Sequence, residues 1–367
     1  MSTFTVPYVD YTNKNASIRE HLVSVFGEVL DSGRYIQGPR VNTFENEFAA
    51  YCGTKHAAGV ANGTCSLEFV LRAWELPENS EVITTPNSFV ASAASIVSAG
   101  LKIKFVDVLP DLNMDPEQLE AAITPQTRVV MPVHLTGRPA NMVEITRIAR
   151  KYHLLVLEDA AQAVGATLHG EKVGSFGDAA SFSLHPLKNL HAFGDAGIVT
   201  SNDQDLIRKI NLLKNHGLSD RSTCEVFSRN CRLDEIQAAL LSVQIKYLDA
   251  WTIERRNLAQ RYNDELRDFV QVPEEAFGEY HVYQTYVVKA KQRNKLQDFL
   301  RTSGIEALVH YPTPIHLQPA FTSHITGNNS FPVAEKLSSE ILSLPLFIGM
   351  NEGQQTFVIN KIKEFYA

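Results

Sequence analysis

The stretch "LLVLEDAAQAVGA" (residues 154–166) begins with four apolar residues, continues with Glu158 and Asp159, and then turns into small side chains. A short apolar run of this kind is typical of a buried strand in a parallel sheet. Ligands of open α/β sheets bind outside the carboxyl ends of the strands, so a carboxylate that closes such a strand is a candidate ligand group. The alternative interpretation is that Asp159 only caps a following helix.

The sequence on both sides of this stretch repeats the same pattern. From about residue 55 to 200, apolar runs alternate with longer amphipathic segments, which indicates strands joined by crossover helices. One such segment, 141–153, places its apolar residues on a single helical face. The sheet is predicted to be largely parallel and covered on both faces. The predicted strands are "EVITT" (81–85), "IKFVDV" (103–108), "RVVMPVH" (128–134), "LLVLED" (154–159), "AASFS" (179–183) and "GIVTS" (197–201).

A long helical pattern separates this α/β part from the rest of the chain. Residues 232–266 keep apolar side chains three or four positions apart and contain no Gly or Pro, so they predict one helix that leaves one domain and enters another. Strand-like 282–290, a following helix candidate and a terminal helix over 352–366 then predict a smaller α+β unit. The 367 residues therefore predict two domains, a large α/β domain over 1–250 and a small α+β domain over 251–367.

The composition favours a globular protein that acts on small molecules. Apolar residues make up 44% of the chain, charged residues 20%, and the formal net charge is -7. No run of Lys and Arg could follow a phosphate backbone, so nucleic acid is not the expected partner. No apolar stretch approaches the ~18 residues that cross a bilayer, and the N-terminus lacks the pattern of a signal peptide. We therefore expect a cytoplasmic protein that does not bind membranes.

The four cysteines, Cys52, Cys65, Cys224 and Cys231, show no CxxC spacing. Their spacing predicts no zinc site and no other metal site. In a cytoplasmic protein they are expected to be reduced thiols that fill small apolar spaces.

Two further stretches offer ligand-binding groups. Asn62, Gly63 and Thr64 stand just before a helical pattern, where unpaired N–H groups and the helix dipole can hold an anion. The same residues also suit an ordinary turn with a helix cap. Phe89 lies among small residues after the strand at 81–85, where it could form either a stacking surface or part of the core.

The stretch "SLHPLKNLHAFGDAGIVT" (183–200) places Lys188 between two apolar runs, five residues after Ser183. A lone lysine is usually a solvated charge. Together with Asp159, the anion-binding helix start and an aromatic face, however, Lys188 supplies what a pyridoxal phosphate site requires. That site needs an amine that forms a Schiff base, an acid beside the pyridine nitrogen, a phosphate cradle and a stacking surface.

The ordered motifs "NGT", "NSFVASA", "LEDAAQAVGA", "SLHPLKNLHAFGDAG", "NCRLDEIQAALL" and "HYPTPIHLQPAF" resemble those of the DegT/StrS-type family of pyridoxal-phosphate-dependent nucleotide-sugar aminotransferases. The likeness covers nearly the whole chain. It implies an aspartate-aminotransferase-like fold (PLP fold type I), in which the large domain has a mostly parallel mixed sheet and a smaller α+β domain follows it. It also implies a homodimer with a shared active site.

The resemblance assigns roles to individual residues. Lys188 would bind the cofactor and carry protons, and Asp159 would hold the pyridine nitrogen protonated. Gln162 would lie beside the ring hydroxyl and Phe89 would stack on the ring. The phosphate would be bound by Gly63, Thr64 and Ser183, and by Asn230 of a neighbouring subunit.

Substrate contacts are also implied by the resemblance. Tyr35 and His316 lie in segments that border the sugar pocket in the family, as does Tyr311. His316 could equally be a structural hydrogen-bonding residue, and Tyr311 could belong to the core. The sequence departs from the family pattern at Asn62, His185 and Ala196, which stand where Ser, an aromatic residue and Gly are frequent; these departures concern the shape of the sugar pocket.

The implied reaction moves an amino group from L-glutamate, through pyridoxal or pyridoxamine phosphate (PLP/PMP), to a keto-deoxy sugar. The acceptor would be a nucleotide-linked 3- or 4-keto-6-deoxyhexose; dTDP, UDP and GDP remain open, as does a phosphosugar. One alternative is a related sugar dehydratase, but such enzymes carry His where this chain has Lys188. A second alternative is a non-catalytic regulatory member of the family, against which the retained Lys188 and Asp159 argue.

Overall fold

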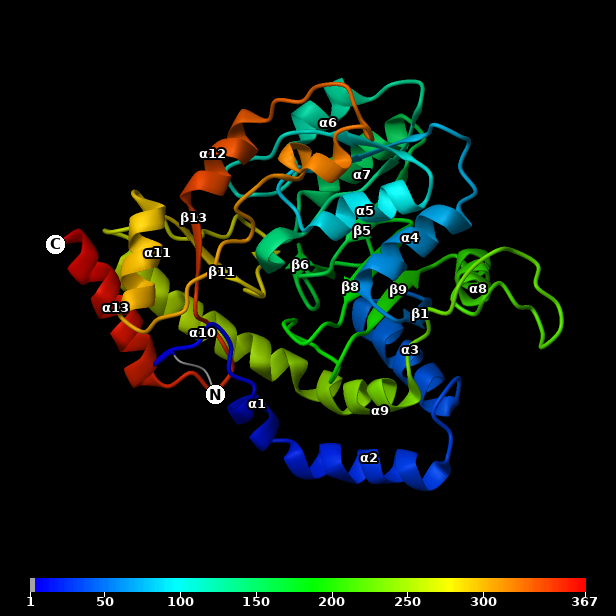
Figure 1. Cartoon of the computed structure of the whole chain (residues 1–367), viewed down its shortest axis with the longest axis horizontal. Coiled ribbons are helices and arrows are strands. Elements are labelled where there is room, and N and C mark those ends of the chain that lie inside the picture. The colour runs from blue at the N-terminus through cyan, green and yellow to red at the C-terminus, as the bar shows by residue number, and fades with distance from the viewer. Residues whose placement is uncertain (1–3) are drawn as a thin grey trace.

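A computed structural model describes residues 4–367. It shows a large α/β unit and a smaller unit built around the C-terminal third of the chain (Figure 1). The helices are α1 (Thr12–Ala16), α2 (Arg19–Ser32), α3 (Pro39–Cys52), α4 (Gly63–Ala73), α5 (Val90–Ser98), α6 (Pro116–Ala122), α7 (Met142–Lys151), α8 (Gln204–Leu213), α9 (Glu235–Gln244), α10 (Leu248–Leu266), α11 (Arg293–Thr302), α12 (Pro332–Glu340) and α13 (Glu352–Tyr366). Short 3-10 turns are η1 (Leu135–Gly137), η2 (Ile245–Tyr247), η3 (Ile315–Leu317) and η4 (Pro319–Phe321).

The strands of the described chain form three sheets. They are β1 (His56–Val60), β2 (Glu81–Thr84), β3 (Lys102–Phe105), β4 (Thr127–Val130), β5 (Leu155–Asp159), β6 (Thr167–Leu168), β7 (Glu171–Lys172), β8 (Ala179–Ser183), β9 (Gly197–Ser201), β10 (Glu279–Tyr280), β11 (Tyr286–Lys289), β12 (Ile325–Thr326) and β13 (Ile341–Leu344). Within residues 4–367 the main sheet has eight strands, in the order β1-β9-β8-β5-β4-β2-β3-β12.

The main sheet is mixed but mostly parallel. Strands β12, β3, β2, β4, β5 and β8 pair in parallel, whereas β9 runs antiparallel to both β8 and β1. All six predicted strands are present. Sequence analysis missed β1 and the two-residue strand β12. Strand β12 forms one edge of the sheet although it lies far from the other strands in the sequence.

Helices cover both faces of this sheet, as the apolar strands predicted. Neighbouring residues of a strand point to opposite faces. On β2, Val82 packs into the cluster that contains α4 residues, while Ile83 packs with Ile145 and Ile148 of α7. The helix expected over 141–153 is α7, and the side chain of Asn141 accepts a hydrogen bond from the Glu144 N–H at its start.

The prediction of a single helix over 232–266 is wrong, because the helix is interrupted. The chain forms α9, tightens into η2 at Ile245–Tyr247 and continues as α10, which runs towards α11 and α13 (Figure 1). No Gly or Pro marks this break. Instead, Gln244, the last residue of α9, is fully buried and its amide donates a 2.7 Å hydrogen bond to the His191 carbonyl. A tertiary contact of this kind leaves no local sequence signal.

The smaller unit packs α10, α11 and α13 against the two-stranded β11–β13 sheet. The terminal helix predicted over 352–366 is α13, and the strand-like 282–290 contains β11. Each unit also contains a segment from the other side of residue 250. Val6 packs into the core of the smaller unit, and β12 pairs with the main sheet of the large unit. The division into domains at residue 250 stays a prediction. Within residues 4–367, no helix has both the length and the apolar character that a membrane span requires.

Candidate active site

Most of the predicted site residues converge at the carboxyl edge of the main sheet. Strand β5 ends there at Asp159, α4 and α5 begin there, and the loop that joins β8 to β9 carries Lys188. A cavity of about 570 Å³ lies between these segments. Eight of the predicted residues line it: Gly63, Thr64, Phe89, Asp159, Gln162, Ser183, Lys188 and Tyr311.

Asp159 presents a buried carboxylate to the cavity. Its Oδ2 accepts a 2.7 Å hydrogen bond from Ser92 Oγ, and its Oδ1 accepts a 3.3 Å bond from the Ala161 N–H. Burial raises the pKa of the Asp159 carboxyl, whereas the hydrogen bond from Ser92 lowers it. Sequence analysis missed Ser92, although it lies one helical turn beyond Ser88, whose hydroxyl is 2.7 Å from that of Ser92.

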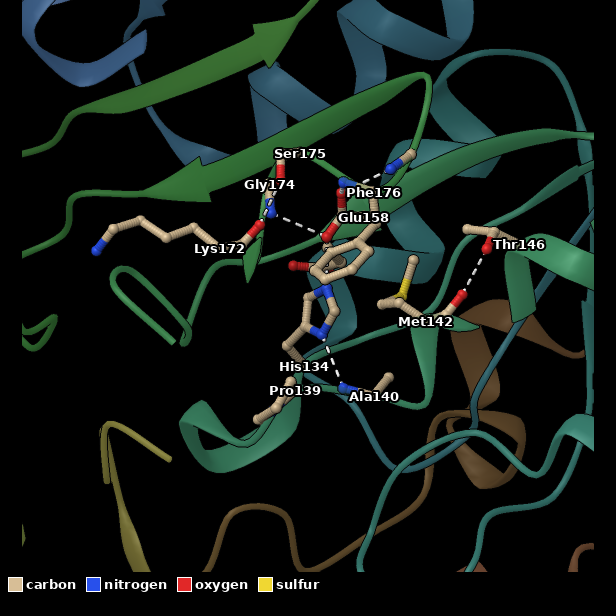
Figure 2. A network of polar contacts seen from close by, with 12 residues as sticks. His134, Pro139, Ala140, Met142, Thr146, Glu158, Lys172, Gly174, Ser175 and Phe176 are labelled. Carbon is tan, nitrogen blue, oxygen red and sulfur yellow. Dashed lines mark hydrogen bonds and ion pairs between the residues drawn. The ribbon is translucent and has the colours of Figure 1, made fainter. Parts of the chain in front are cut away.

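Glu158, the neighbour of Asp159, points to the other face of the sheet and organises the backbone behind the site (Figure 2). Its carboxylate accepts hydrogen bonds from the N–H groups of Gly174, Phe176 and Gly177, at 2.8–2.9 Å. Its fourth partner is His134 Nε2 at 3.0 Å. Because His134 Nδ1 accepts the Ala140 N–H, Nε2 carries the hydrogen that Glu158 accepts. Glu158 is thus a structural carboxylate, and Asp159 is the one available to a ligand.

Lys188 is held in place through its backbone neighbours. Gln284, in the segment before β11, accepts the Asn189 N–H at 3.0 Å and donates to the Leu187 carbonyl at 2.6 Å. One amide side chain therefore fixes the residues on both sides of Lys188. Burial lowers the pKa of the Lys188 amine to about 8, opposed by the attraction of Asp159. The amine can therefore gain and lose a proton near neutral pH.

The start of α4 forms the anion-binding end of the cavity. Asn62 caps the helix by accepting the Cys65 N–H at 2.9 Å. A β-carbon on Gly63 would lie only 2.9 Å from Ser183 Cβ and 3.2 Å from Ser183 Cα, so glycine permits the close approach of α4 to β8. The helix N–H groups and the Ser183 hydroxyl can serve one phosphate together.

The prediction that all four cysteines are reduced thiols is wrong for two of them. Cys65, in the first turn of α4, forms a disulfide with Cys231, with Cα atoms 6.9 Å apart. The two lie 166 residues apart in the sequence, so no spacing pattern connects them. The two segments also share a backbone contact, since the Ala61 N–H donates a 3.0 Å hydrogen bond to the Cys231 carbonyl. Cys52 and Cys224 are free.

Aromatic and amide groups form another wall of the cavity. The Phe89 ring is 54% exposed and lies 5.6 Å from the Tyr311 ring, so its face is available to a planar ligand. Gln162 donates to the Tyr311 hydroxyl at 3.2 Å and accepts the Thr136 N–H at 2.6 Å. Sequence analysis missed His310, which also lines the cavity and whose pKa burial lowers to about 4.

Three predicted site residues lie outside this cavity. Asn230 and Tyr35 are exposed on the surface. His316 is buried; its Nε2 is 3.1 Å from Glu335 and its ring packs 4.8 Å from the Phe331 ring. Their binding roles stay predictions, and the contacts of His316 are those of a structural residue.

These residues fit a planar aromatic phosphate whose aldehyde reacts with an amine. The cavity supplies an exposed ring face, a carboxylate at one end, a helix start at another and a lysine amine. Among residues 4–367, no group of three or more His, Cys, Asp or Glu side chains is placed to hold a metal ion. Fold and site therefore define an α/β protein that can hold pyridoxal phosphate through Lys188.

Residues 16–363 match the DegT/DnrJ/EryC1/StrS aminotransferase family, and the chain belongs to this family. It is 42% identical over 366 residues to a pleiotropic regulatory protein of Geobacillus stearothermophilus, with 98% of each chain covered. It is 38% identical over 364 residues to the dTDP-3-amino-3,6-dideoxy-α-D-galactopyranose transaminase of Aneurinibacillus thermoaerophilus, covering 98% of this chain and 99% of the relative. The crystal structure of DesV of S. venezuelae in complex with a ketimine intermediate matches with a TM-score of 0.95 and 36% identity over 98% of both chains. The predicted family and fold class are confirmed.

Proposed function

We propose that this protein uses pyridoxal phosphate to transfer the amino group of L-glutamate to the C3 ketone of a dTDP-linked 6-deoxy sugar. The observation that carries the proposal is that Lys188 and Asp159 line the same cavity as the first residues of α4. The transaminase from Aneurinibacillus supports the choice of dTDP and of C3 as the first substrate to test.

Each residue of the site has a separate task. The helix start with Gly63, Thr64 and Ser183 binds the phosphate, and Phe89 covers one face of the ring. Asp159 keeps the ring nitrogen protonated. When bound, the cofactor supplies an electron sink for deprotonation beside the transferred nitrogen. Lys188, with a pKa lowered by burial, would take that proton from the carbon on one side of the transferred nitrogen and return it to the carbon on the other side.

The protein acts as a homodimer in this proposal, with Asn230 reaching the phosphate of the partner's site. Two observations support a dimer. Helix α2 buries one apolar stripe, but Val23, Phe26 and Leu30 form a second stripe that is 41–55% exposed. The exposed loop 219–227, which is close to Asn230 in the sequence, extends away from the body of the large unit (Figure 1).

Replacing Lys188 with Ala tests the catalytic assignment. The variant should lose the visible absorbance band of the lysine-bound cofactor, and turnover with glutamate and the keto sugar should fall by roughly 10²–10⁴-fold or more. Lys246→Ala, at an exposed lysine of η2, is the matched control and should keep both. Normal turnover by the Lys188 variant would refute the assignment.

The similarity to a pleiotropic regulatory protein makes a non-catalytic function a second candidate. The absorbance spectrum of the cofactor-loaded protein distinguishes an enzyme from a regulatory protein. An enzyme loaded with pyridoxal phosphate loses its absorbance band when glutamate is added, because the amino group moves to the cofactor. A spectrum that does not change with glutamate favours the regulatory function. A sugar dehydratase is disfavoured because Lys188 is present where those relatives carry His.

A further inference from the structure

A second, smaller cavity of about 90 Å³ adjoins Lys188. Its wall comes from the N-terminal segment, from α10 and from the residues that follow Lys188. It shares five lining residues with the larger cavity: Gln162, Leu187, Lys188, His310 and Tyr311. A molecule that occupies the small cavity therefore lies next to Lys188.

Two buried cations line this cavity without an ionic partner. Lys14 is 6% exposed; its amine donates to the Asn189 carbonyl at 2.9 Å and lies 4.2 Å from the centre of the Trp251 ring. Arg255 is 8% exposed and donates to the Tyr283 and Gln284 carbonyls. Among residues 4–367, neither forms an ion pair with a carboxylate. A buried, unpaired charge destabilises the fold, so two in one cavity call for a function.

Neutral polar groups of the same wall also lack partners. Thr285 Oγ1, Tyr11 Oη and His191 Nε2 are buried without a hydrogen-bond partner in the described chain, and Thr285 and His191 are 6% and 3% exposed. The two hydroxyls can donate to a ligand. His191 Nδ1 is 3.0 Å from the Ala192 carbonyl and donates to it, which leaves Nε2 as an acceptor. A neighbouring anion would favour protonation of Nε2 and so turn it into a donor.

The carboxylates nearest to this cluster are already engaged. Asp10 accepts the Thr12 N–H at 2.9 Å and the Thr12 hydroxyl at 2.6 Å. Glu254, which follows Ile253 on α10, accepts the Gly349 N–H at 2.7 Å. Asp10 lines the cavity and keeps its charge, so the wall sets two cations, Lys14 and Arg255, against one carboxylate and adds hydroxyl donors. Burial, aided by Arg255, lowers the pKa of Lys14 to about 7, and a bound anion would restore its full charge.

We propose that this small cavity binds a carboxylate of the amino donor and so orients the donor's amino group towards Lys188. The inference rests on the proposed function and adds a donor subsite to it. Size supports the assignment, because 90 Å³ accepts a carboxylate with its adjoining carbons, whereas the larger cavity is left for the cofactor and the sugar. The donor and its keto-acid product share this carboxylate, so both bind here.

Binding of an unreactive dicarboxylate tests the subsite without turnover. Glutarate, which has the carbon chain of glutamate but no amine, is titrated by calorimetry into the cofactor-loaded protein. Lys14→Met keeps the length of the side chain and removes its charge, and Lys14→Gln keeps a donor for the Asn189 carbonyl. Both variants should bind glutarate about ten- to a hundredfold more weakly than the wild type, and the exposed-lysine control Lys246→Met should not change.

The half-reactions add a readout that a structural role would not affect. The rate constant for conversion by glutamate should fall at least about tenfold in both Lys14 variants, while that for the keto sugar should stay within about twofold. Thermal unfolding without ligand should show Lys14→Gln to be no less stable than the wild type, because it removes a buried, unpaired charge and keeps a donor for the Asn189 carbonyl.

The outcomes separate this proposal from the proposed function. Glutarate binding that depends on Lys14, with no spectral response to glutamate, would support the subsite and overturn the aminotransferase. A normal spectral response with glutarate affinity within about twofold of wild type in both variants would overturn the subsite alone. Loss of both half-reactions together with a large loss of thermal stability would also overturn it, in favour of a structural role for Lys14.

Discussion

Asp159 is useful as a carboxylate only if it keeps its negative charge in a buried position. Burial opposes that charge, and the hydroxyl of Ser92 at 2.7 Å is the strongest group that supports it. A proton on Asp159 would leave the pyridine nitrogen of a bound cofactor without its counter-charge. Ser92 is therefore a positioning residue that acts through Asp159.

Replacing Ser92 with Ala should raise the pKa of Asp159, because one hydrogen bond to the charged form is lost. The acidic limb of the kcat/KM profile should move upwards by about one pH unit, so activity is lost first at low pH. Ser95→Ala is the matched control, since Ser95 is buried in the same helix but donates only to the Ser92 carbonyl. An unchanged acidic limb in Ser92→Ala would show that Ser92 does not support the charge.

The site residues that could be predicted from the sequence lie at the end of a recognisable strand or within a motif of the family. Asp159 closes an apolar strand, and Lys188 lies in a motif of the family. Gln284 and Lys14 were missed for a physical reason. Gln284 acts on Lys188 from 96 residues away in the sequence, through the neighbouring backbone groups, and Lys14 looks like any surface lysine until the fold buries it.

The first turn of α4 joins the anion site to the sheet. It is capped by Asn62, tied to Cys231 by a disulfide, and brought against β8 by the lack of a side chain at Gly63. These three contacts fix the direction of the helix N–H groups. The order of the strands behind α4 was not predicted, because continuous apolar runs reveal a strand but not its neighbours.

Gly63→Ala tests this arrangement. The new methyl group would force α4 away from Ser183, so affinity for pyridoxal phosphate should fall by about tenfold or more while far-ultraviolet circular dichroism stays unchanged. Gly27→Ala in α2 is the control, since a β-carbon there meets nothing within 4 Å. It should keep cofactor affinity and gain slightly in stability from the better helix propensity of Ala. Wild-type cofactor affinity in Gly63→Ala would contradict the close-approach argument.

One chain brings together most but not all of the predicted site. Asn230 lies on the surface, next to Asn215 in an isolated bridge, and does not line the cavity of its own chain. The exposed apolar stripe of α2 requires a cover, and a second copy of the chain would supply one. No single-chain pattern could decide between a residue that is merely exposed and one that completes a neighbouring site.

Mixed dimers decide this question. Lys188→Ala and Asn230→Asp should each be nearly inactive alone, because the first lacks the catalytic amine and the second sets a negative charge against the phosphate. If Asn230 crosses between subunits, a mixed dimer has both defects in one site and an intact second site, so random reassociation restores about a quarter of wild-type activity. Lys188→Ala mixed with Asp159→Asn is the control and should restore nothing, since both residues line the cavity of the same chain. No recovery in the first mixture, with dimer exchange verified by differently tagged chains, would place Asn230 outside the partner's site and leave each active site to a single chain.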